Sequence, residues 1–197
     1  MPLSPLAVHE LTESVLACVC AALDETATQV EGQPGCPECR RCVVPGTAAW
    51  DGCEDPCTGE ASGQLTVNVT RIYPSTTSSF PSPDQTVRDL RNCQPPPVTA
   101  VELVVTLLRC APGPTEDGCP PDCDLLSEAA RVLHVDALTV YSALLCCLPA
   151  TGGGRRGRQF VLGQQRIIGP QGGCVGLEQT VTVALPACPP CTTKETV

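Results

Sequence analysis

Two parts of the chain repeat their apolar residues with a helical period. Residues 6–23 place apolar side chains at spacings of three and four, with Glu10 and Glu13 on the opposite face and Ser4 positioned as a cap. A second such stretch covers residues 124–148, where Asp122 or Asp124 is placed to cap the first turn. This spacing is typical of amphipathic helices, so the pattern predicts two helices.

Other segments alternate with a period of two, which is typical of half-buried strands. Residues 64–73 alternate cleanly, and residues 98–110 are apolar on both faces, which predicts a central strand. Residues 160–168 and 175–185 predict a hairpin whose turn is at residues 169–174, and a short strand is expected at 40–44. Runs of strands flanked by helices predict an α+β fold: an antiparallel or mixed sheet with two helices.

The remaining segments show almost no periodicity. Residues 25–62 form an insert rich in Cys, Pro and Gly, and residues 74–97, rich in Ser, Thr and Pro, predict a long surface loop. Loops that exceed the usual connection length are commonly functional. At 197 residues the chain is long enough for one domain, which we expect to span residues 1–197.

Composition excludes several classes of function. Twelve Lys and Arg against twenty-one Asp and Glu give a net charge of −9, which has the wrong sign for neutralising phosphates. With one Trp, two Tyr and two Phe, stacking platforms for single-stranded nucleic acid are not expected. We also expect neither a secretory leader nor a membrane span, because no basic start with a long apolar run is seen.

Catalytic constellations are scarce. His9 and His134 are the two histidines, and both fall within predicted helices, where a surface position is the simplest interpretation. No phosphate-binding loop of the Walker type is present. We therefore predict no enzymatic activity, and keep as a competing hypothesis a cysteine nucleophile with His134 as its base.

Sixteen cysteines give the strongest chemical signal. Cys36, Cys39, Cys53 and Cys57 are spaced for a tetrahedral zinc site, and a second C-x₂-C pair stands at residues 188–191. We favour disulfides or free thiols over a metal for these residues, and the sequence leaves all three states open. The cysteines at positions 18, 20, 146 and 147 lie on or beside helix faces, where we expect them to act as small core residues.

One cationic cluster stands out in the acidic chain. Arg155, Arg156 and Arg158 follow three consecutive glycines. The cluster is interpreted either as a solvated loop or as an interface with an acidic partner.

The order of the predicted elements resembles that of the tail terminator proteins of long-tailed bacteriophages. The segments QLTVNVTRIYP at residues 64–74 and AVELVVTLLRC at residues 100–110 are similar to terminator-like neck proteins of phages that infect actinobacteria. The insert at residues 25–62 and the hairpin turn depart from the minimal family pattern.

The resemblance implies a virion structural protein that assembles in the host cytoplasm. Such a protein forms a homohexameric ring on the tail tube, stops addition of the major tail tube protein and joins the tail to a head-completion or stopper protein. DNA passes through the channel without specific binding, in keeping with the acidic charge. Cysteines around residues 36–57, Cys119 and Cys123 are then expected to oxidise after lysis. The alternatives are a zinc- or disulfide-stabilised protein-binding module and another phage neck or connector protein.

Overall fold

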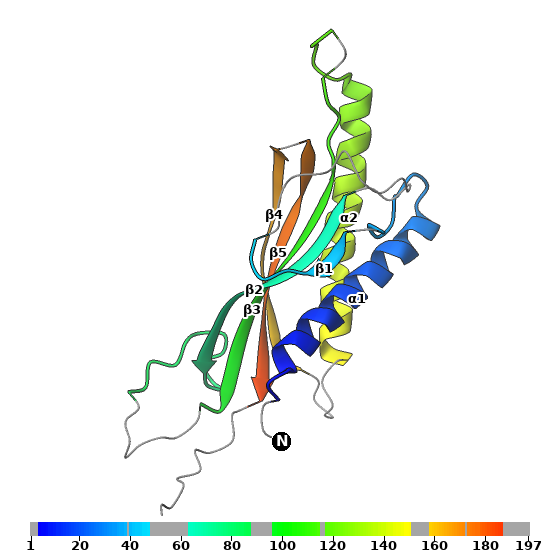
Figure 1. Cartoon of the computed structure of the whole chain (residues 1–197). Coiled ribbons are helices and arrows are strands. Elements are labelled where there is room, and N and C mark those ends of the chain that lie inside the picture. Colours follow the sequence, from blue (N-terminus) through cyan, green and yellow to red (C-terminus); the bar gives the residue numbers. More distant parts are fainter. Residues whose placement is uncertain are drawn as a thin grey trace, which may run out of the picture.

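A computed structural model of the chain shows an α+β fold made of one helical layer and one sheet (Figure 1). The structure describes residues 4–38, 40–47, 63–87, 96–114, 117–150, 158–171 and 173–186. Both helices contribute to a single apolar cluster with one face of the sheet. The predicted fold class is confirmed.

The sheet has five strands in the order β1-β2-β3-β5-β4. Its members are β1 (Arg41–Val43), β2 (Gln64–Ser75), β3 (Val98–Cys110), β4 (Phe160–Gln171) and β5 (Cys174–Pro186). β1 runs parallel to β2 and the other neighbours are antiparallel, so the sheet is mixed. β3 is central, as its two apolar faces predicted, and its bounds match the predicted ones.

Two strands, β2 and β4, continue two or three residues beyond their predicted ends. β2 continues through Pro74 to Ser75, where backbone N–H of Asp84 donates to Pro74 O at 2.7 Å. The surface loop therefore starts at residue 76. β4 runs to Gln171, so the predicted turn at 169–174 narrows to the residues next to Gly173, whose φ of 74° suits glycine.

The first helix, α1 (Ala7–Gln29), is longer than its apolar period predicted. Thr26 lies beyond that period, but its hydroxyl donates to Ala22 O at 2.8 Å and contacts the Thr139 hydroxyl of α2 (Cys123–Ala150) at 3.2 Å. Contact with the second helix thus stabilises the last turns of α1, which lie in the predicted insert at residues 25–62. Leu6, and not Ser4, occupies the N-cap position, while Ser4 Oγ accepts the Leu6 N–H at 3.2 Å.

A buried ion pair joins the two layers. Arg109 of β3 and Asp136 of α2 are 6% and 0% exposed, with Arg109 Nε 2.8 Å from Asp136 Oδ2. Gln33 Nε2 donates to Asp136 Oδ1 at 2.6 Å, and Arg109 Nη2 donates to Gly35 O at 2.6 Å. The cluster therefore ties the central strand, α2 and the segment after α1 to one another.

The second helix is an exception to the expectation that no segment is long and apolar enough to span a membrane. Its stretch Cys123–Pro149, 27 residues with a mean hydropathy of 1.6, is long and apolar enough by composition to cross a membrane. In the fold this helix packs against α1, β4 and β5 and places Asp136 in the buried ion pair. Only 33% of the most apolar window of this stretch is buried in the fold, so much of its apolar surface is exposed.

Candidate functional site

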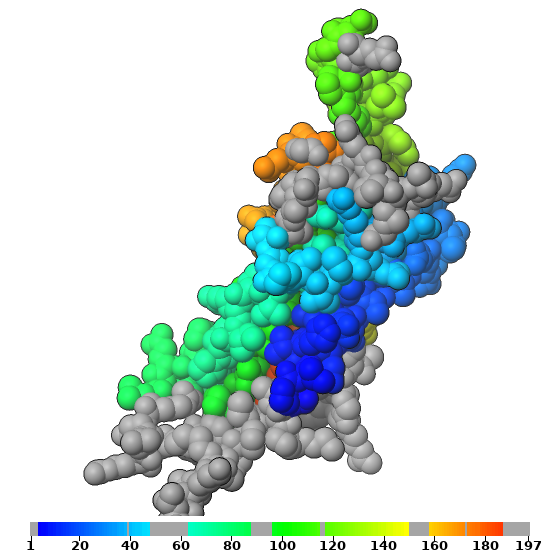
Figure 2. Space-filling view, in the orientation of Figure 1, coloured from blue at the N-terminus to red at the C-terminus, as the bar shows by residue number. Residues whose placement is uncertain are grey.

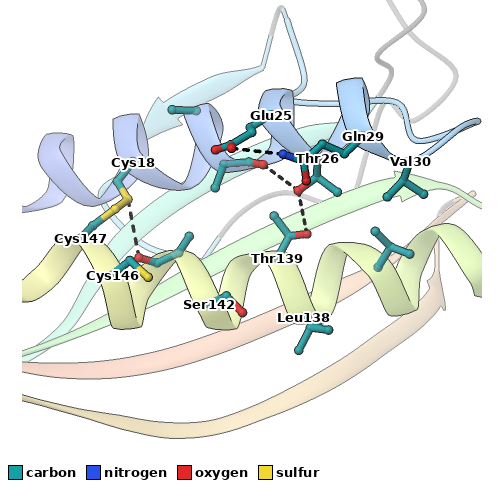
Figure 3. A pocket seen from close by; sticks show the side chains of 14 residues that line it. Cys18, Glu25, Thr26, Gln29, Val30, Leu138, Thr139, Ser142, Cys146 and Cys147 are labelled. Atoms are coloured by element: carbon teal, nitrogen blue, oxygen red, sulfur yellow. Dashed lines mark hydrogen bonds between the residues drawn. A yellow bond between two sulfur atoms is a disulfide. The ribbon is translucent and has the colours of Figure 1, made fainter.

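A groove of about 760 Å³ runs between α1 and α2 (Figure 3). The cross-helix pairs Cys18–Cys147 and Thr26–Thr139 show that the helices are antiparallel, because the partner number falls by eight as the first rises by eight. Eight residues of helix rise about 12 Å. The two helices therefore stay side by side along the groove.

Small side chains create the hollow. Ala21 and Ala22 line it from α1, and Ser142 and Ala143 line it from α2, with the larger Leu138 at its rim. Short side chains between adjacent helices leave space that a longer residue would occupy. The surface that remains is mostly apolar and is open to solvent on the side away from the sheet (Figure 3).

One acidic side chain, Glu25, borders this groove. α1 contains Glu10, Glu13, Asp24 and Glu25 and neither Lys nor Arg. Glu25 lines the groove, where its Oε1 accepts a hydrogen bond from Gln29 Nε2 at 3.2 Å. Because the lining contains Glu25 and neither Lys nor Arg, the charge in the groove is negative.

An apolar stripe on α2, which we call the outer stripe, lies beside the groove. It consists of Leu138, Tyr141 and Leu145, which are 67%, 43% and 43% exposed. The N-terminal turns of the same helix project beyond the sheet and expose Leu125 and Leu126 (Figure 2). Contiguous exposed apolar residues mark interaction sites in soluble proteins.

The sheet has two further candidate surfaces at its edges. Among the described residues, β4 pairs only with β5, and β1 covers only residues 65–67 of β2. Ile167 of β4 and Ile72 of β2 are 51% and 56% exposed. Unpaired strand edges are templates for pairing with another chain.

The proposed zinc ligands are not brought together in the described part of the chain. Cys36 is joined to Cys20 by a disulfide with a Cα–Cα distance of 5.0 Å, which leaves it no thiolate for a metal. Cys39, Cys53 and Cys57 lie outside the described residues. Within those residues no group of three His, Cys, Asp or Glu side chains is close enough to hold a metal ion.

The helix cysteines are not all core residues, contrary to expectation. Cys18 and Cys147 form a disulfide across the two helices with Cα atoms 6.4 Å apart, a separation that such a bond permits. Cys20 is bonded to Cys36, and its Sγ accepts from Arg41 Nη1 at 3.2 Å. The thiol of Cys146 is free and exposed and lines the groove. The antiparallel register places the cysteines opposite each other, which a single helix pattern does not reveal.

The remaining candidate residues are placed as follows. Arg158 is half-buried, and desolvation lowers its pKa, while Arg155 and Arg156 lie outside the described residues. His134 is exposed on α2, as predicted. It is twelve residues from Cys146, or about 18 Å along the helix. These two side chains therefore do not form a nucleophile and base pair.

Sequence reasoning missed the groove and the outer stripe. The outer stripe has a signal in residues 124–148, whose apolar positions are too numerous for one helix face, but the groove has none. No protein-family model matches the chain, and no curated protein sequence matches it.

Proposed function

We propose that the protein is a ring-forming tail terminator of a long-tailed phage. In this role a homohexamer sits on the head-proximal end of the tail tube, stops polymerisation of the major tail tube protein and receives a head-completion protein. The virion neck is its place of action and the host cytoplasm its place of assembly. The element order that suggested the family, helix, strands, helix, strand, strand, is the order in the fold.

The observation that carries the proposal is the pair of strand edges at the two ends of the sheet that have no neighbouring strand among the described residues. The β4 edge and the edge of β2 beyond residue 67 differ in sequence, so contact between them is heterologous. Heterologous contacts repeat around an axis and close into rings when the rotation permits. Closure covers both edges of every subunit, which removes the site at which further chains add.

The acidic charge supports the same role. A net charge of −9 makes the assembled ring strongly anionic. A channel lined by carboxylates repels the phosphates of DNA and lets the duplex slide without specific contact. The proposal therefore includes DNA as a passing molecule and not as a ligand.

Native mass spectrometry of the full chain tests the ring. We expect six copies that persist with reductant and with chelator, and the same protein is expected to halt elongation when added to polymerising tail tube protein. A monomer at all concentrations, or tubes that keep growing, would overturn the proposal. Monomers that appear only on chelation would support the metal-held binding module instead.

Paired variants test the edges themselves. Ile72→Lys and Ile167→Lys each place a charge on one open edge and leave the other intact. Each variant alone is expected to stay monomeric, and a mixture of the two is expected to form dimers but no ring. Leu145→Lys, which adds the same charge on the helical layer, is the control and is expected to keep the hexamer. Rings formed by both edge variants would show that the edges are not the interface.

A further inference from the structure

We propose that the groove between α1 and α2 is a docking site for an amphipathic helix of a partner protein, with Lys or Arg flanking the helix's apolar face. This site is separate from the strand edges assigned to ring formation. The length, lining and charge of the groove support this docking site, and they do so whether or not the chain forms a ring.

The length of the groove fits a short helix. On α1 its lining extends from Cys18 to Val30, and on α2 it extends from Val135 to Cys147. Twelve residues of helix rise about 18 Å, so each wall is about three turns long. A helix of that length presents apolar residues at positions i, i+3, i+4 and i+7, the pattern by which helices bind in apolar grooves.

The lining fits an apolar face. Ala21, Ala22 and Ala143 have short side chains, which leave space between the helices for a large side chain of a partner. Leu138 at the rim is 67% exposed, and a partner side chain in that space would bury part of its surface. Burial of such surface favours binding, and the hydrophobic effect needs no specific polar contact.

Charge selects the occupant. Glu25 lines the groove on a helix that has no basic residue, so the groove favours a partner with cationic flanks. A second copy docked face to face through this groove would bring no cation to Glu25, because the lining contains neither Lys nor Arg. An anionic lipid surface would place like charge beside Glu25. The basic helix of another protein is the occupant that these charges favour.

A synthetic peptide of about four helical turns provides the probe, with Leu at the i, i+3, i+4 and i+7 positions and Lys on both flanks. Its twin carries Glu in place of Lys. With the full, disulfide-bonded chain, we expect fluorescence anisotropy to show the Lys peptide binding at least ~10-fold tighter than the twin, in line with like-charge discrimination. Absence of binding, or equal binding of both peptides, would overturn the proposal.

Matched variants locate the binding. Ser142→Trp fills the groove from an exposed position and is expected to reduce affinity ~10-fold or more, whereas Ser127→Trp, exposed on the same helix outside the lining, is expected to have no effect. Glu25→Lys is expected to weaken binding of the Lys peptide and to strengthen binding of the Glu peptide. Glu10→Lys makes the same charge change beyond the groove. Equal effects of the two charge variants would mean attraction to the whole acidic protein and would refute a local site.

A chemical footprint distinguishes the occupants. Cys146 lies in the groove and Cys42 on β1, and both thiols are free and exposed. Iodoacetamide labelling read by peptide mass spectrometry is expected to show that the Lys peptide protects Cys146 and leaves Cys42 reactive. Protection of Cys146 that grows with protein concentration alone identifies a second copy as occupant. Protection by anionic vesicles identifies a membrane, and either result overturns the proposal.

Discussion

The buried pair Arg109–Asp136 should control the stability of the whole fold. Its charges lie 2.8 Å apart with exposures of 6% and 0%. Arg109 Nη2 also contacts Asp136 Oδ1 at 3.1 Å, which makes the pair bidentate. We predict that Asp136→Leu and Arg109→Met, made singly, each destabilise the protein by about 3–5 kcal/mol, because each leaves the other charge buried without its counter-ion.

The double variant makes the prediction specific. Replacing a buried ion pair with apolar residues of similar size is often neutral or stabilising, because the desolvation cost of both charges disappears. We therefore expect the double variant to be more stable than either single one. Gln33 loses its acceptor in that variant and retains its bond to Val132 O at 3.2 Å, so some destabilisation relative to the natural chain is expected to remain.

Urea unfolding followed by circular dichroism provides the measurement. With a slope of about 2 kcal/mol per molar urea, a loss of 3–5 kcal/mol lowers the midpoint by about 1.5–2.5 M. Glu128→Leu is the control: its ion pair with Arg131 lies at the surface, the two side chains are 57% and 38% exposed, and the urea midpoint is expected to stay close to that of the natural chain. Single variants that unfold at the natural midpoint, or a double variant as unstable as the sum of the singles, would refute the reasoning.

Three other perturbations test the packing. Replacing Cys18 and Cys147 by Ser releases a link across 129 residues, which the chain-entropy model values at up to about 5 kcal/mol, and reductant should then have a smaller effect on unfolding than it has on the natural chain. Leu107→Ala, at a fully buried position, is expected to cost about 2–5 kcal/mol in urea unfolding, against less than about 0.5 kcal/mol for the exposed Leu145→Ala. Gly176→Ala would place a Cβ 2.1 Å from Leu107 O, so a fall in Tm of about 5 °C or more is expected in calorimetry.

The strands were predictable because burial on one face leaves a direct trace in the sequence. In β3, Val101, Leu103, Val105 and Leu107 all face the helices, and each is fully buried. Where a tertiary contact determines the end of an element, the sequence pattern does not show it. The last turns of α1 are polar, and only the Thr26–Thr139 contact shows why the helix continues there.

The groove could not be predicted from the pattern, because periodicity identifies apolar residues but not their neighbours. Leu144 and Leu145 are adjacent in sequence, yet the first is fully buried and the second is 43% exposed. Gln179 shows the opposite case: its place in the alternation of β5 puts it on the buried face despite its polarity, and it is fully buried, with Nε2 donating to Gly163 O at 3.0 Å. Which apolar residues remain exposed depends on how the two helices meet.

The disulfides and the groove are parts of one arrangement. Small residues between α1 and α2 leave space unfilled, and a hollow between helices forfeits dispersion contacts and apolar burial. A covalent bond between Cys18 and Cys147 at one end of the groove holds the helices together without filling that space. The second disulfide, Cys20–Cys36, holds the same helix to the segment that leads into β1. Two covalent links on α1 thus offset incomplete packing, and the groove keeps its shape for a partner.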